Sequence, residues 1–175
     1  TRAVRVSAAV PGPQDIVVEA IDLNGGGSVS LDVAEWPDGV DVSADGRRLA
    51  VVVQGLCSVY ELPSLRALAS ARVPSGRWAY EPIFVTGDRV RIHPYRSWRR
   101  RDDPSTPPPP LEDPTAAELA VSSRTVTTLA TYPLFTIPLA PRPSQGVDPG
   151  PVFNLLPSPD LSRVLVLGFG SAHAV

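Results

Sequence analysis

Short apolar runs, each broken by a polar turn, recur along most of this chain. Residues 16–23 and 28–33 show partial alternation of apolar and polar positions on either side of Asn24-Gly25-Gly26-Gly27. Alternation with a period of two predicts half-buried strands, and Asn-Gly between two such runs favours a tight hairpin. Two further pairs of runs show the same organisation: 57–62 with 66–73, and 117–122 with 125–132. The pattern predicts antiparallel hairpins along the chain and little helix.

A second, longer sequence pattern also repeats along the chain. It consists of an apolar strand, a polar turn with aspartate, an arginine and a second apolar strand, and it occurs at residues 39–53, 82–92 and 152–167. Its arginines are Arg48, Arg89 and Arg163, at intervals of 41 and 74 residues. The first interval matches the period of about 40–45 residues expected for a four-stranded propeller blade. The second is longer because two proline-rich stretches, 99–114 and 138–151, lie within it.

The repeat therefore predicts an all-β fold of consecutive four-stranded antiparallel blades of a β-propeller, with an incomplete ring. We expect a single partial propeller domain over residues 1–175, with an Arg/Pro-rich insertion at 99–114. The expected blades are about 1–36, 37–77, 78–145 and 146–175. Because four incomplete blades would leave open sheet edges, we expect the natural protein to be longer. Equivalent positions after each turn should be buried: Leu49, Val51, Val90, Ile92, Val164 and Val166.

The turn at residues 43–51, Ser-Ala-Asp-Gly-Arg-Arg-Leu-Ala-Val, resembles the repeat of bacterial WD40-like, YVTN-type and TolB-type propellers. Residues 158–166, Ser-Pro-Asp-Leu-Ser-Arg-Val-Leu-Val, look like a second copy. The chain departs from those families in lacking a Trp-Asp dipeptide, and it has Gly87-Asp88 where they have Asp-Gly. The resemblance implies the fold class. It names no substrate, because propellers serve as enzymes, receptors and scaffolds.

Composition narrows the classes of partner. Proline, at 21 of 175 residues, argues against long helices. The net charge of −2 gives no general attraction to nucleic acid or to an anionic membrane, and no apolar run is long enough to span a bilayer. The sequence favours a cytoplasmic location, or an envelope or secreted one if a signal lies upstream.

Residues with catalytic or metal-binding chemistry are few. The two histidines, His93 and His173, have no further ligands at a metal-site spacing, and we expect His93 to be solvated or locally hydrogen-bonded. Cys57 lies in an apolar run, which predicts a buried, inert thiol. The inner strands offer Asp41, Glu81 and Asn154, which form no repeated set. We assign no catalytic, cofactor-binding or metal-binding residue.

One segment stands out as a possible partner-binding site, namely Trp98, Arg99, Arg100 and Arg101. Arginine beside an aromatic ring is suited to protein interfaces and to stacking on bases. Asp102 and Asp103 follow at once, so a solvated loop with internal ion pairs is the favoured interpretation, a protein-binding loop is the alternative, and nucleic acid is disfavoured. Other tryptophans, at positions 36 and 78, are expected to seal gaps between blades.

These patterns favour a non-enzymatic protein-interaction or scaffold module that binds another protein through its blade-face loops. Two alternatives stay open. The chain could be part of a propeller-type enzyme, either a hydrolase or lactonase-like, or it could be a TolB-like propeller of the cell envelope.

Overall fold

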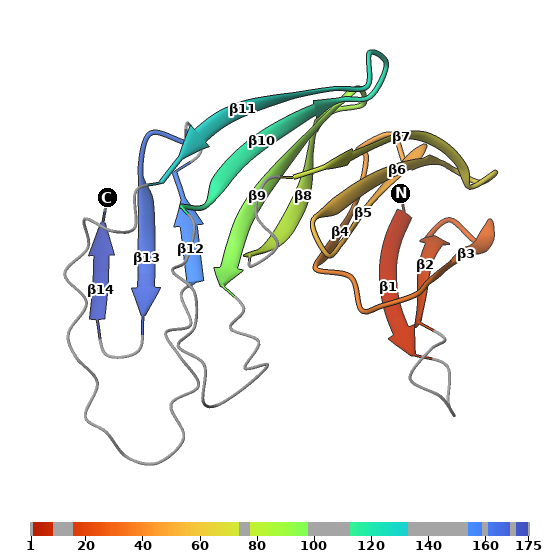
Figure 1. Cartoon of the computed structure of the whole chain (residues 1–175). Coiled ribbons are helices and arrows are strands. Elements are labelled where there is room, and N and C mark those ends of the chain that lie inside the picture. Colours follow the sequence, from red (N-terminus) through yellow and green to blue (C-terminus); the bar gives the residue numbers. More distant parts are fainter. Residues whose placement is uncertain are drawn as a thin grey trace.

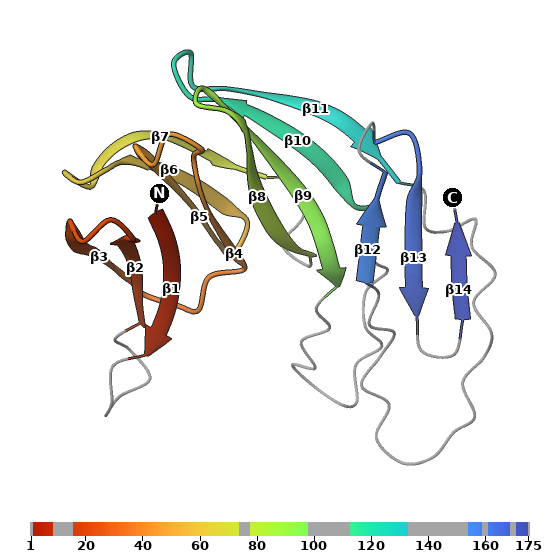
Figure 2. The same ribbon diagram turned by 180° about the vertical axis from the view of Figure 1, so that it is seen from behind.

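The structure is a computed structural model that describes residues 2–8, 16–73, 78–97, 113–132, 154–158, 161–168 and 171–174. All regular structure in these residues is β-strand. The strands form twisted antiparallel sheets that stand side by side in an open arc, seen from opposite sides in Figure 1 and Figure 2. The predicted all-β fold, with propeller-like blades and no closed ring, is confirmed.

The strands are grouped by their order along the chain. The first sheet holds β1 (Arg2–Ala8), β2 (Ile16–Asp22) and β3 (Gly27–Val33). The second sheet holds β4 (Gly39–Val42), β5 (Arg48–Val53), β6 (Leu56–Glu61) and β7 (Arg66–Arg72). Next come β8 (Trp78–Thr86), β9 (Arg89–Ser97), β10 (Thr115–Ala120) and β11 (Thr125–Thr131), which we call the third sheet.

The last strands are β12 (Asn154–Pro157), β13 (Val164–Gly168) and β14 (Ser171–Ala174). They pair with one another, and they join the third sheet through a single residue pair between Asn154 of β12 and Arg96 of β9. Residues 34–38 and 73–77 connect the first three sheets. The division into blades at 36/37, 77/78 and 145/146 stays a prediction.

The repeat is visible in equivalent strands and turns. β5 and β9 begin at Arg48 and Arg89, and β13 begins one residue after Arg163. Equally long turns, residues 23–26, 62–65 and 121–124, close the hairpins β2–β3, β6–β7 and β10–β11. Thus β3, β7 and β11 occupy the same position in their sheets, and β1, β5 and β9 each precede a hairpin of this kind.

The turn before β5 explains why the Ser-Ala-Asp-Gly motif forms a tight bend. The N–H of Ser43 donates to the carbonyl of Arg48 at 3.0 Å, and the N–H of Arg48 donates back to the Ser43 hydroxyl at 2.9 Å. Gly46 adopts a φ of 69°, which glycine tolerates without steric cost. Ser158 makes the same two contacts with the arginine five residues later, at 2.9 and 3.0 Å, and Leu161 takes the left-handed position with a φ of 61°.

One apolar layer lies between the first and second sheets, and another lies between the second and third. β5 contributes to both, because Leu49 and Val51 face the first sheet whereas Ala50 and Val52 face the third. The layer between the second and third sheets also contains Val59, Tyr80, Val90, Ile92, Ala117 and Leu119. Predicted burial is confirmed at Leu49, Val51, Val90 and Ile92, all 2% exposed or less. The side chains of Val164 and Val166 lie outside the described residues.

Polar contacts tie the second sheet to the third. The Asp41 carboxylate accepts a hydrogen bond from the N–H of Phe84 at 2.7 Å, which links β4 to β8. Gly39 allows these strands to approach, since a Cβ there would lie 2.8 Å from the carbonyl oxygen of Tyr80. At the outer side, Arg124 Nε donates to the carbonyl of Leu68 at 3.1 Å. The two sheets are therefore joined at both their inner and outer strands.

Candidate interaction surface

The connections between strands differ between the two ends of the sheets. Because neighbouring strands are antiparallel, successive connections alternate between the ends. β1, β9 and β13 all run toward the lower side of Figure 1, so the connections that follow them leave at that end. We call this the insertion end, and its connections are 9–15, 34–38, 54–55, 73–77, 98–114, 132–153 and 169–170. The opposite, turn end has 23–26, 43–47, 62–65, 87–88, 121–124 and 158–163.

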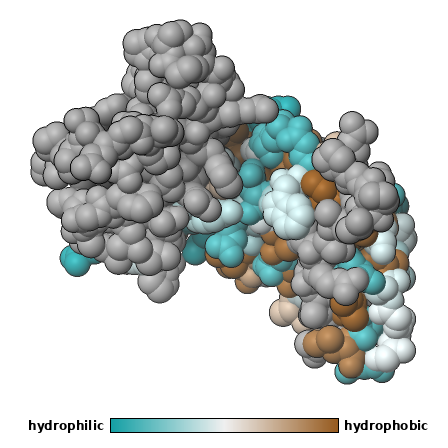
Figure 3. All heavy atoms as spheres, turned by 90° about the horizontal axis from the view of Figure 1, so that it is seen from below, coloured by the Kyte–Doolittle hydropathy of each residue, from teal (hydrophilic) through white to brown (hydrophobic). Residues whose placement is uncertain are grey.

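The two longest connections, 98–114 and 132–153, both leave at the insertion end. The sequence-predicted site residues Trp98, Arg99, Arg100 and Arg101 belong to the first of these, but they lie outside the described residues. What the structure describes is the strand before them, β9, which ends at Ser97. Their part in binding stays a prediction. Figure 3 looks onto this end, where hydrophobic and hydrophilic side chains are interspersed over the described surface.

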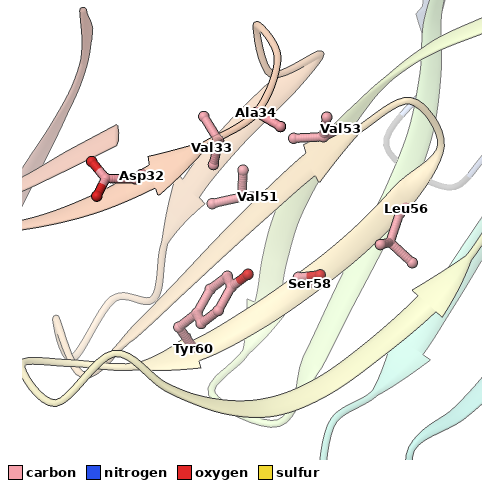
Figure 4. A pocket seen from close by; sticks show the side chains of 8 residues that line it. All are labelled: Asp32, Val33, Ala34, Val51, Val53, Leu56, Ser58 and Tyr60. Atoms are coloured by element: carbon pink, nitrogen blue, oxygen red, sulfur yellow. The ribbon is translucent and has the colours of Figure 1, made fainter. Parts of the chain in front are cut away.

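A groove lies between the first and second sheets (Figure 4). It has a volume of about 230 Å³ and is lined by Asp32, Val33, Ala34, Val51, Val53, Leu56, Ser58 and Tyr60. Val33 of the first sheet faces Val51 of β5, and Ser58 and Tyr60 come from β6. Ala34, Val53 and Leu56 adjoin connections 34–38 and 54–55, so the groove reaches the insertion end. No short sequence motif marks it, because its walls come from separate strands.

Beside the groove, the connection 34–38 is held by hydrogen bonds. The N–H of Asp38 donates to the carbonyl of Val52 at 2.7 Å, and the Tyr95 hydroxyl donates to the Asp38 carbonyl at 2.9 Å. The Gln54 amide donates to the Glu35 carboxylate. The backbone is thus bonded at Asp38, on one side of Trp36, and a side-chain contact holds Glu35 on the other, yet the Trp36 side chain is 60% exposed.

The exposure of Trp36 corrects one expectation from the sequence. Trp36 and Trp78 were both expected to seal gaps between blades. Trp78 does so, since it is 2% exposed within the layer between the second and third sheets. Trp36 instead presents its ring to solvent, because residues 34–38 pass along the insertion end rather than between two sheets. Exposed tryptophan at a rigid position is typical of interface anchors.

Acidic groups dominate this part of the chain. Residues 16–62 contain eight carboxylates and two arginines, and both arginines, Arg47 and Arg48, lie at the turn end. Burial raises the pKa of the Asp38 carboxyl, a hydrogen bond from the N–H of Gly55 opposes this shift, and the charge of Glu35 raises the pKa further. The carboxylates of Glu35 and Asp38 therefore lie close enough on connection 34–38 to repel each other.

The inner-strand acids have other roles. Asp41 accepts the hydrogen bond from Phe84 described above, as well as one from the N–H of Val42 at 2.8 Å, so it serves packing between sheets. Glu81 is exposed, and the side chain of Asn154 lies outside the described residues. No group of three or more His, Cys, Asp and Glu side chains within the described residues could hold a metal ion.

The titratable groups in the core are structural. His93 is 3% exposed, and its Nε2 lies 3.4 Å from the Tyr132 hydroxyl, so it is hydrogen-bonded rather than solvated. Burial, together with the charge of Arg91, lowers the pKa of His93 to about 4. Cys57 is fully buried as predicted, and burial raises the pKa of its thiol to about 12.

Several solved structures match the fold of this chain at low sequence identity. The β-propeller domain of Cps50 (Swd1) from Myceliophteria thermophila matches with a TM-score of 0.53 and 13% identity, over 98% of this chain and 48% of that one. The β-propeller domain of the Trilobed protease from Pyrococcus furiosus matches with a TM-score of 0.48 and 14% identity, over 98% of this chain and 52% of that one. An acylaminoacyl peptidase from Pyrococcus horikoshii matches with a TM-score of 0.49 and 15% identity, over 98% of this chain and 30% of that one.

The match to the Cps50 (Swd1) domain, together with the strand order, makes the chain a β-propeller module by fold. The chain spans about half the length, or less, of these matched structures. At such low identity the similarity establishes the fold alone. No protein-family model and no curated sequence matches the chain. Within the described residues there is no helix long and apolar enough to cross a membrane.

Proposed function

We propose that this chain is a protein-interaction module of the β-propeller type, and that it binds its partner through the insertion end. The observation that carries the proposal is that β9 and β11, which precede the two longest connections, end on the side of the sheets where the exposed Trp36 and the groove lie. Surface connections held by a rigid scaffold are the usual carriers of binding, and tryptophan and arginine are enriched among residues that dominate interface energies.

The opposite end supports the proposal by contrast. Its turns are short and internally bonded: the Asp88 carboxylate accepts hydrogen bonds from the N–H and hydroxyl of Ser122 at 3.0 and 2.7 Å. Arg48 contacts the carbonyl of Gly87, which joins two turns of neighbouring sheets. These contacts join turn-end groups of neighbouring strands and sheets to one another, whereas Trp36 at the insertion end presents its ring to solvent.

The test compares two triple variants in affinity capture of native partners from cells that express the protein. Replacing Arg99, Arg100 and Arg101 by alanine should weaken capture with little change in melting temperature, because solvated surface residues contribute little to stability. The matched control replaces Arg47, Arg66 and Arg163, three exposed arginines of the turn end, and should retain capture.

Undiminished capture by the insertion variant would remove these three arginines from the proposal. Equal loss in both variants would show that capture depends on overall charge rather than on this end of the molecule. A large fall in melting temperature of the insertion variant alone would show that its arginines are structural.

A further inference from the structure

The groove between the first and second sheets has the dimensions of a side-chain pocket. Small-molecule sites usually enclose about 300–1,000 Å³, so a groove of about 230 Å³ is small for a cofactor. Its lining is mixed: Val33, Val51 and Val53 lie on facing strands, Leu56 lies at the rim, 38% exposed, and Asp32, Ser58 and Tyr60 add polar groups. These properties suit one or two apolar side chains of a partner.

The charged residues around the groove indicate which charge a partner side chain should carry. Asp32 lines the groove and is exposed, and Glu35 and Asp38 follow on the adjoining connection. One arginine, Arg72, pairs across the ladder with Leu56 and lies at the outer margin. The carboxylates outnumber it, so a cationic side chain next to the apolar one is favoured over an anionic one.

The backbone next to the groove indicates an extended partner. β3 is the outer strand of the first sheet and pairs only with β2 within the described residues. An extended peptide can add to such an edge, and its alternate side chains then point to one face. β7 and β11 are also outer strands, but the groove lies beside β3.

We propose that this groove binds an extended segment of a partner protein that carries an aliphatic side chain next to an arginine or lysine. The inference rests on the proposed function and specifies the chemistry of the partner at the insertion end. The aliphatic side chain contacts the accessible parts of Val33, Val53 and Leu56, and the cation pairs with Asp32.

The probe is a fluorescein-labelled decapeptide with a central leucine flanked by arginines in a glycine–serine background, and binding is followed by fluorescence anisotropy. Two matched peptides replace the leucine by glycine, or the arginines by glutamate. The chain should bind the first peptide and lose most of the binding with either replacement, because each removes one of the two contacts.

Three variants of the chain locate the site. Ser58→Trp fills the groove and should weaken binding by about tenfold or more. Asp32→Asn removes the rim charge and should weaken binding by about two- to fivefold, as expected for an exposed ion pair. The control Glu81→Gln neutralises an exposed carboxylate of the third sheet and should bind like the parent chain. Circular dichroism and thermal melting confirm that each variant is folded.

If the Ser58→Trp chain does not fold, Leu56→Ala replaces it, with Leu23→Ala of the turn end as its control. Equal binding of the leucine and glycine peptides would overturn the proposal, and so would equal weakening by Glu81→Gln and Asp32→Asn. Sedimentation that shows self-association blocked by Ser58→Trp would also overturn it, since a second copy would then be the occupant.

The same variants separate the inference from the proposed function. If the Ser58→Trp chain captures native partners as well as the parent chain, the groove proposal fails while the interaction module stands. If the parent chain binds the leucine–arginine peptide but captures no native partner, the groove proposal stands and the proposed function fails.

Discussion

The layer between the second and third sheets can be tested with two isoleucines that lie near each other on opposite faces of the same strand pair. Ile92 of β9 is fully buried, whereas Ile83 of β8 is 44% exposed on the other face. Ile92→Ala removes buried methyl groups and leaves a cavity among Tyr80, Val90 and Ala117, so it should cost about 2–5 kcal/mol. Ile83→Ala should cost about 1 kcal/mol or less, because much of its side chain already contacts water.

The free energy of unfolding is measured by urea titration followed by tryptophan fluorescence, with the m-value checked for constancy. A domain of this kind is stable by about 5–15 kcal/mol, so the larger loss could abolish folding. In that case Ile92→Val, with an expected cost of about 0.5–1.5 kcal/mol, provides the measurement. If Ile83→Ala destabilised the protein as much as Ile92→Ala, the assignment of the strand faces would be wrong.

Three further predictions follow. The pKa of His93 is lowered to about 4 from its ordinary 6.5 by burial and the charge of Arg91, so the unfolded state binds a proton that the folded state does not. Stability should therefore fall as pH decreases from about 6.5 to about 4, and the urea midpoint of His93→Gln should vary less over this window. Iodoacetamide at pH 8 should leave Cys57 unmodified in the folded chain and alkylate it in urea; equal rates would contradict its burial and raised thiol pKa. From the sequence, limited trypsin digestion should cut first at Arg99–Arg101, and earlier cleavage elsewhere would count against an accessible loop.

The strand pattern was predictable because a period of two fixes which side chains face the core. Val90 and Ile92 alternate with Arg89 and Arg91, and this contrast assigns the faces of β9 without any knowledge of its neighbours. The tight turns were predictable for a similar local reason, since the bonds of Ser43 to its own turn require only nearby residues. Features that depend only on residues close together in the chain can be predicted from a single sequence.

Burial could not be predicted where a strand departs from the two-residue alternation of buried and exposed side chains. Trp78, Ala79 and Tyr80 are all buried in succession, because the ladder of β8 with β9 shifts register between Ala79 and Tyr80. An irregularity of this kind places consecutive side chains in the core, and no residue type marks it. The exposure of Trp36 was missed for a different reason. Whether a connection passes between sheets or over their ends depends on the spacing of the sheets, which the sequence does not encode locally.

The groove between the first and second sheets could not be predicted from the sequence either. Asp32 and Ser58 are far apart in the sequence, and they line one surface because strands of the first and second sheets lie side by side there. Such a surface depends on the angle between two sheets, which is set by many apolar contacts together. A candidate site of this kind can be recognised only from the assembled structure.

The difference between the two ends of the sheets connects the fold to the proposed function. At the turn end, the bonds of Ser43, Asp88 and Ser158 set strand register, so insertions there would disturb the packing between sheets. At the insertion end, length can vary at low cost because lengthening a surface connection adds only slowly to its closure entropy. Binding residues can therefore change at that end without changing the scaffold. Substitutions at the turn end should accordingly alter stability more than binding, and substitutions beside Trp36 should alter binding more than stability.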